Sequence, residues 1–148
     1  SPSKSDDSIV LSNEYNYPDF MLLLNNQIAM FKSTGQKFNL VSIILDPVAQ
    51  ISGIITVNQL RNSISAIIEK KNKMCVLENR IFILFGRSAE EKIKKTISEI
   101  KNNLPEKDSD YLEIISKYIS VVNLEISEQT ENAEQLIASI SSLPGKII

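Results

Sequence analysis

Apolar residues recur at helical spacing after Pro18 and then merge into one strand-length run. The first pattern predicts a helix that ends at Gly35, and it consists of Phe20, Leu24, Ile28 and Phe31. The run over residues 38–45 is almost entirely apolar and stops at Asp46 and Pro47, where proline removes a backbone donor. We expect a central strand here, because a strand covered on both faces is the one that tolerates such a run.

The middle of the chain predicts a second helix followed by a β-hairpin. The helix is indicated by apolar residues at helical spacing, namely Val57, Leu60, Ile64 and Ile67. Two short apolar segments follow, residues 74–77 and 81–85, and they are joined through Glu78, Asn79 and Arg80. A short polar connection between two apolar segments favours a hairpin, and we expect its strands to flank the central strand.

The last third of the chain predicts two helices around one further strand. Ser88 and Glu91 fit a capping box, so a helix is expected from there to Pro105. The apolar positions of residues 111–115 fit neither the helical nor the strand period over enough residues. The segment could therefore form a short helix or an edge strand. Residues 118–126 are rich in β-branched residues and predict a strand, after which Thr130 is expected to cap a final helix.

The predicted elements follow in the order α-β-α-β-β-α-β-α, without an internal repeat. An α/β (α+β) two-layer fold, with a mixed central sheet of about five strands flanked by helices, is the simplest way to bury their apolar faces. A length of 148 residues suits one domain with its own core. We assign this domain to residues 13–148 and expect residues 1–12 to be a disordered arm or an expression remnant.

Composition excludes several classes of function. Histidine is absent, which removes the usual general base and the commonest metal ligand. The single cysteine, Cys75, lies in an apolar segment and is expected to be a buried, inert thiol, which fits a reducing cytoplasm. A net charge of −2 gives no electrostatic case for nucleic acid or an anionic membrane, and no apolar run is long enough to span a bilayer.

The order of elements and the hairpin resemble a GGDEF domain, the catalytic domain of diguanylate cyclases. The resemblance covers roughly residues 18–140 and implies the ferredoxin-like fold of nucleotide cyclases. It places the signature loop on five consecutive residues, Glu78, Asn79, Arg80, Ile81 and Phe82, of which only the final Phe agrees with the family. Asp46 matches the family's metal-binding aspartate at the end of the first strand. The chain therefore resembles a degenerate member of this family.

The resemblance implies that the family's chemistry is lost. In active members paired glycines let the nucleotide approach the backbone, and acidic residues at the third and fourth loop positions support metal binding and catalysis. Here Arg80 and Ile81 occupy those two positions. The inhibitory R-x-x-D site of many members corresponds to residues 69–72, which match neither end. We therefore expect no catalytic, cofactor-binding or metal-binding residues, no cofactor and no bound nucleotide.

Each signature position also has a purely structural explanation. Asp46 is either a cap beside Pro47 or the remnant of a site, and Glu78 with Asn79 forms either a solvated tip, in which Asn79 tolerates a left-handed backbone, or a recognition element. Phe82 is expected to pack in the core. We further expect Arg80 to approach Asp46 and close the former cleft.

The sequence favours a catalytically inactive GGDEF-like signalling or regulatory domain of a bacterial protein. Its partner would be another protein or a second copy, and the domain would lie in the cytoplasm, alone or as the cytoplasmic part of a larger or membrane-anchored protein. A non-catalytic receptor for a nucleotide or cyclic di-GMP is the alternative. An unrelated α/β interaction module is a further alternative, and an enzyme that uses the same cleft with other residues is the least favoured.

Overall fold

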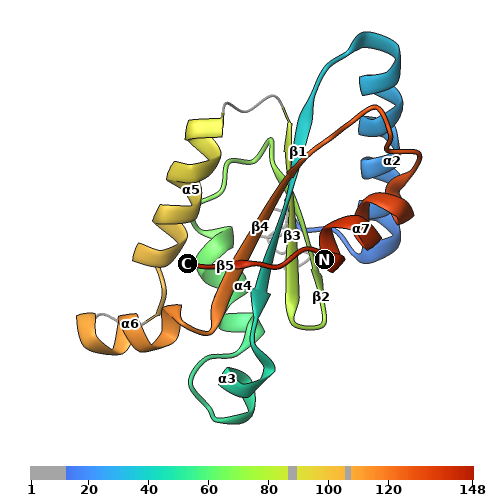
Figure 1. Cartoon of the computed structure of the whole chain (residues 1–148). Helices are drawn as coiled ribbons and strands as arrows, with labels where there is room; N and C mark the ends of the chain where they lie inside the picture. Colours follow the sequence, from blue (N-terminus) through green and yellow to red (C-terminus); the bar gives the residue numbers. More distant parts are fainter. Residues whose placement is uncertain (1–12, 87–89, 106–107) are drawn as a thin grey trace, which may run out of the picture.

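The computed structural model describes residues 13–86, 90–105 and 108–148. The predicted arm at residues 1–12 therefore lies outside the described residues, as does the Ser88 cap. The elements are α2 (Tyr17–Thr34), β1 (Phe38–Leu45), α3 (Pro47–Ile51), α4 (Val57–Ser65), β2 (Lys73–Leu77), β3 (Arg80–Gly86), α5 (Glu90–Asn102), α6 (Ser109–Ser116), β4 (Ile119–Glu125), α7 (Ala133–Ser142) and β5 (Lys146–Ile147) (Figure 1).

One five-stranded sheet runs through the molecule in the order β2-β3-β1-β4-β5. Strand β1 lies at its centre, as its apolar run predicts. Every pairing between these strands is antiparallel, so the prediction of a mixed sheet is wrong. The described residues contain one parallel contact, an isolated bridge between Glu14 and Met74. The hairpin does not flank β1 with both of its strands, because β3 pairs with β1 while β2 lies beyond β3.

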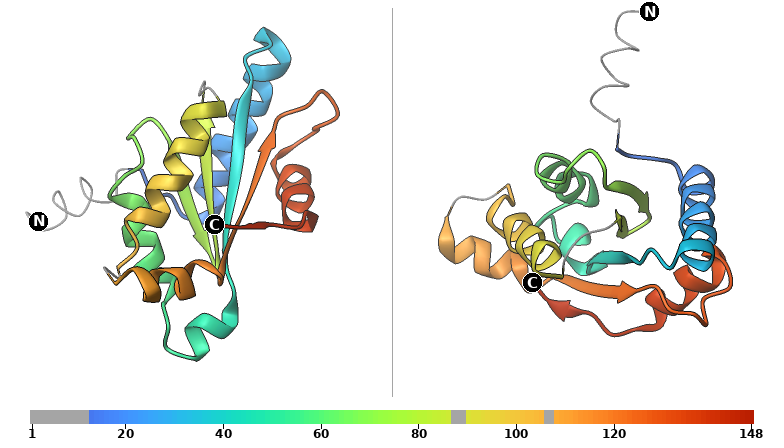
Figure 2. Two further views of the ribbon diagram at one scale, coloured as in Figure 1. Left: turned by 60° about the vertical axis from the view of Figure 1, so that its left-hand side comes forward. Right: turned by 90° about the horizontal axis from the view of Figure 1, so that it is seen from above.

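Helices cover both faces of the sheet. Helices α4, α5 and α6 bury one apolar cluster against one face, and α2 and α7 bury a second cluster against the other (Figures 1 and 2). The succession β1-α4-β2-β3-α5-β4 is the one found in ferredoxin-like folds. The predicted class and strand number are therefore confirmed, and α2 with α7 adds a third layer to the expected two.

Local signals explain most of the element boundaries. Helix α2 begins after Asn16, whose side chain accepts a hydrogen bond from the Asp19 amide, and it ends at Gly35 with φ 76°. The last helix is capped by Asn132, not by Thr130 as predicted, since the Asn132 side chain accepts the Gln135 amide. Residues 111–115, which the pattern left open, belong to the helix α6.

Two elements have no counterpart in the sequence pattern, α3 and β5. Both are too short to display a period. Strand β5 continues into Ile148, whose amide donates to the Ile119 carbonyl at 2.9 Å and whose side chain packs on the α5 side of the sheet. Among the described residues, no helix has the length and apolar composition needed to cross a bilayer.

Candidate functional site

The hairpin tip and the end of β1 are tied together by two hydrogen bonds. The Leu45 amide donates to the Asn79 carbonyl at 2.9 Å, and the Asn79 side-chain amide donates to the Leu45 carbonyl at 2.8 Å. Asn79 thus satisfies both backbone groups of the last β1 residue. The structure therefore brings together Asp46 and the signature positions, as the resemblance implies, but it uses Asn79 as a brace between two strand ends.

Glu78 holds the strained position of the turn. Leu77 pairs with Arg80, so the turn has two residues, Glu78 and Asn79, and Glu78 has φ 54°. The expectation that Asn79 takes the left-handed conformation is wrong, because Glu78 takes it. A residue with a Cβ is disfavoured there, whereas glycine, which the family has in its loop, is not.

Replacing Glu78 with glycine is expected to raise the free energy of unfolding by up to about 1 kcal/mol, since relief of the left-handed strain exceeds the added chain entropy of glycine. Urea denaturation of the two proteins measures the difference. Glu78→Ala is the matched control, because it removes the carboxylate and keeps the Cβ. Equal gains for both substitutions would show that charge, and not backbone strain, sets the cost at this position.

Asp46 acts as a helix cap. Its Oδ1 accepts a hydrogen bond from the Val48 amide at 3.0 Å, and Pro47 follows at the first helical position of α3. The side chain is exposed and forms no ion pair with the other described residues. Of the two explanations that the sequence left open for Asp46, this geometry supports the structural one directly.

Arg80 does not approach Asp46, contrary to our expectation. Its guanidinium lies on the α7 side of the sheet, where it donates to Ser42 Oγ at 3.3 Å and to the Ser141 carbonyl at 3.4 Å. Ser42 is fully buried in β1, and Ser141 belongs to the last turn of α7, where free carbonyls and the helix dipole favour a cation. Arg80 therefore joins β3, β1 and α7.

Loss of this link is expected to lower stability. Arg80→Ala should reduce the free energy of unfolding by about 1 kcal/mol, because it removes the donor to Ser42 and the cation at the α7 terminus. A double-mutant cycle with Ser42→Ala, followed by urea denaturation, measures the coupling. The account expects Ser42→Ala to cost less in the Arg80→Ala background than alone; strictly additive effects would contradict the link.

Ile81 and Phe82 point to opposite faces of β3 and are both fully buried. Ile81 belongs to the cluster under α4 and α5, and Phe82 belongs to the cluster under α2 and α7. The prediction that Phe82 packs in the core is confirmed. Neither side chain is available to a ligand at the tip, where Glu78 is exposed and Asn79 and Arg80 are partly buried.

The single cysteine is buried in the sheet. Cys75 is a free, fully buried thiol in β2, as predicted, and burial together with the nearby Glu14 charge raises its pKa to about 11. In the described ranges, no group of three or more Cys, Asp or Glu side chains is placed to share a metal ion.

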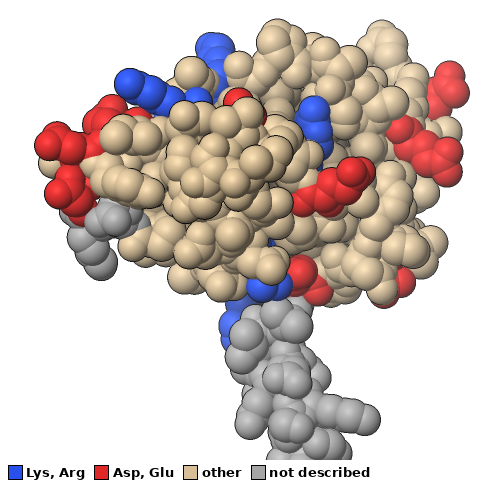
Figure 3. All heavy atoms as spheres, turned by 90° about the horizontal axis from the view of Figure 1, so that it is seen from below, with Lys and Arg blue, Asp and Glu red and all other residues tan. Residues whose placement is uncertain are grey.

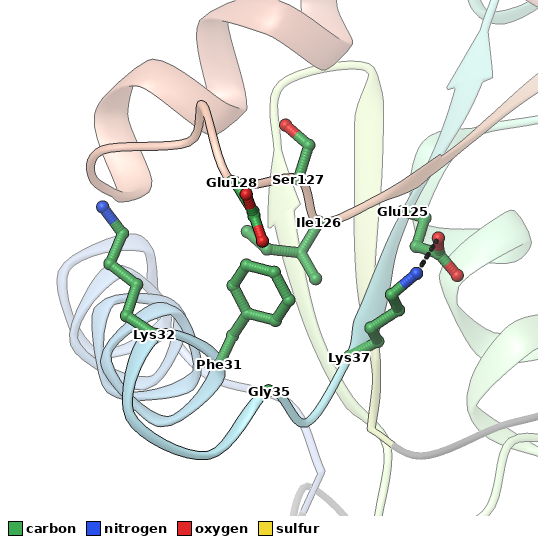
Figure 4. A pocket seen from close by; sticks show the side chains of 8 residues that line it. All are labelled: Phe31, Lys32, Gly35, Lys37, Glu125, Ile126, Ser127 and Glu128. Carbon is green, nitrogen blue, oxygen red and sulfur yellow. Dashed lines mark hydrogen bonds and ion pairs between the residues drawn. The ribbon is translucent and has the colours of Figure 1, made fainter.

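Two hollows that the sequence pattern did not predict lie away from the hairpin tip. One, of about 710 Å³, is at the opposite end of β1, between the end of α2 and the segment that follows β4. Figure 4 shows Phe31 beside Ile126 at its centre, and Lys37 paired with Glu125 at 3.4 Å. A second hollow, of about 600 Å³, lies between α5 and β5. Their residues come from distant parts of the chain, so no local motif marks them.

Comparison with protein-family models finds no match, and no curated protein matches the chain. Solved structures do match. The diguanylate cyclase SiaD from Pseudomonas aeruginosa, in complex with its activator SiaC, superposes with a TM-score of 0.65 at 9% identity over 95% of this chain and 61% of that chain. A diguanylate cyclase protein from Thermotoga maritima gives 0.59 at 14% identity, over 89% and 96% of the two chains.

The GGDEF domain of FimX from P. aeruginosa gives a TM-score of 0.61 at 15% identity, over 86% of this chain and 84% of that domain. These values establish that the chain has the fold of GGDEF domains. The chain spans less than two thirds of the SiaD chain. Because the sequence identities are low, the similarity concerns the fold and does not extend to the residues of the site.

Proposed function

We propose that this chain is a catalytically inactive GGDEF-like regulatory domain that works by contact with another protein or with a second copy of itself. The observation that carries the proposal is the arrangement of the hairpin tip. Asn79 is committed to Leu45, Asp46 caps α3, and Arg80 turns to the opposite layer to contact Ser42 and Ser141. Asn79 and Arg80, at positions that the resemblance equates with a loop glycine and an acidic ligand, instead link strands and a helix of the fold.

The loss of acidic groups supports the same proposal electrostatically. Metal-assisted attack on a triphosphate needs carboxylates that hold a divalent cation and neutralise developing charge. The resemblance implies such ligands at two loop positions, which here hold the cation Arg80 and the buried, apolar Ile81. The exposed carboxylates near the tip are those of Asp46, which caps α3, and Glu78, and among the described residues they belong to no group of three or more Asp, Glu or Cys side chains that could hold a metal ion.

Regulation through protein contact has a parallel among the structural neighbours. SiaD is a diguanylate cyclase in complex with its activator, SiaC, so a protein that contains this fold is found with a regulatory partner. We propose a bacterial origin, because neighbours with this fold come from Pseudomonas aeruginosa and Thermotoga maritima, and a cytoplasmic location, with which the single free thiol is compatible.

Isothermal titration calorimetry with GTP and with cyclic di-GMP, each in the presence of Mg²⁺, tests the proposal against the receptor alternative. No heat above dilution is expected at micromolar concentrations of either ligand. Saturable heat with cyclic di-GMP would contradict the proposal and would show that the domain is a receptor for this ligand. Glu78→Ala serves as the control variant, because Glu78 is the exposed member of the loop and its loss should change neither result.

A further inference from the structure

The most exposed large apolar side chain of the described residues lies on a short projecting helix. Ile51 in α3 is 85% exposed and Val48 is 51% exposed. We call α3 with the turn at Ser52 and Gly53 the α3 knob. From Pro47 to Leu60 the chain has no charged residue. The face from which α3 projects shows a broad central area without charged side chains (Figure 3).

The α3 knob is held in one conformation by its own hydrogen bonds. The Ala49 carbonyl accepts the Ile54 amide at 2.8 Å, and the Gln50 side chain accepts the Val57 amide at 2.8 Å. Ala49 is fully buried, while Gly53 has φ 73°, which suits the turn that returns the chain to α4. A preorganised knob loses little entropy when it binds, so its exposed apolar tip is suited to a matching hollow.

A hollow of that kind exists on the same chain. The hollow of about 600 Å³ between α5 and β5, which we call the α5–β5 groove, is lined by Ile97, Val121 and the C-terminal residues Leu143 and Ile147. Ile147 is 66% exposed, second only to Ile51 among the large apolar side chains described, and Leu143 is 41% exposed. Covering this apolar surface with a partner's apolar side chain would contribute favourably to binding.

The charges beside the two surfaces are opposite. At the base of the α3 knob lie the exposed carboxylates of Asp46 and Glu78, and neither forms an ion pair within the described parts of the chain. In the groove, Lys94 pairs with Glu90 at 3.6 Å, so that among the charged side chains described in its lining Lys146, which is exposed, is without an ion pair. Attraction between the two surfaces follows, and contact between two knobs would instead set like charges against each other.

We propose that the α3 knob of one copy inserts into the α5–β5 groove of a second copy, with both Asp46 and Glu78 facing Lys146. The proposal rests on the proposed function and names its partner. Because the two surfaces differ, the contact is head-to-tail, and each copy keeps a free knob or a free groove for the next. An anionic membrane does not fit, since the carboxylates at the base of the knob would be repelled.

The contact surface is small, so the association is weak, with a dissociation constant of about 0.1 mM. Sedimentation of the full chain from about 10 µM to about 1 mM is expected to show a mass that rises past that of a dimer. Ile51→Asp and Ile147→Asp should each weaken association at least tenfold. Leu22→Asp is the matched control, because Leu22 is 63% exposed on α2 and belongs to neither surface.

Mixing the two variants gives the decisive result. Ile51→Asp keeps its groove and Ile147→Asp keeps its knob, so an equimolar mixture should form one-to-one dimers and nothing larger. Charge reversal adds a second readout, in which Lys146→Glu weakens association and Glu78→Lys on the same chain restores it. A monomeric wild type, unchanged association in both apolar variants, or a mixture that stays monomeric overturns the proposal.

Failure of this contact is distinguishable from failure of the proposed function. A chain that stays monomeric, and that binds neither GTP nor cyclic di-GMP, would still be an inactive interaction domain whose partner is a different protein. A chain that binds or converts the nucleotide overturns the proposed function, whatever its state of association.

Discussion

Replacing Phe82 with alanine is expected to lower the free energy of unfolding by about 3–5 kcal/mol. Phe82 is fully buried in the centre of the sheet, between β1 and β2, and packs in the cluster under α2 and α7. Truncation removes apolar contacts and leaves a cavity that the strands on either side cannot close. Urea denaturation followed by circular dichroism measures the loss.

The conservative control is Phe82→Leu, which retains most of the buried volume and is expected to cost less than about 1.5 kcal/mol. Phe82 is also the one residue of the five signature positions for which the resemblance implies agreement with the family. A loss below about 1 kcal/mol for Phe82→Ala would mean that this agreement does not reflect packing.

Gly145→Ala is expected to destabilise the domain by about 1–3 kcal/mol. A Cβ at residue 145 would lie 2.7 Å from Ser120 Oγ and 2.8 Å from Ser120 Cβ, so β5 must move away from β4. The same movement should loosen the α5–β5 groove. Thermal and urea unfolding measure the stability, and hydrogen exchange of the Ile148 amide reports whether β5 has detached.

Two further variants separate this clash from a general effect of alanine. Gly86→Ala is the control, because a Cβ there has no atom within 4 Å and Gly86 lies at the end of β3. Ser120→Gly in the Gly145→Ala background removes both clashing atoms and should restore stability. An equal loss for Gly86→Ala, or no rescue by Ser120→Gly, would contradict the close approach of β5 to β4.

The sequence was sufficient to predict the helices and strands whose apolar residues follow a long, clear period. The stripe from Phe20 to Phe31 gave α2, and the run over residues 38–45 gave the central strand, because burial on one or two faces leaves a direct trace in the pattern. The second cluster under α2 and α7 was not predicted as a separate layer. Periodicity reveals that a helix has an apolar face, but not which side of the sheet that face covers.

The candidate site was predictable only in its location. The pairing of the hairpin with β1 placed Asp46 beside the tip, as the family resemblance implied. The partner of Arg80 was missed, because Ser42 and Ser141 lie 38 and 61 residues away along the chain and offer a hydroxyl and a carbonyl, which no charge pattern reveals. The sequence analysis expected the left-handed backbone conformation at Asn79 and not at Glu78, because asparagine adopts that conformation more readily than glutamate.

The direct test of the central claim is the production of cyclic di-GMP from GTP by the purified domain, with Mg²⁺ and separately with Mn²⁺. The account predicts no product above a control without protein, because Arg80 and Ile81 stand at the two loop positions where the family resemblance implies acidic residues. Asp46→Ala is the matched variant and should give the same baseline. Formation of cyclic di-GMP by the wild-type domain, abolished by Asp46→Ala, would contradict the account.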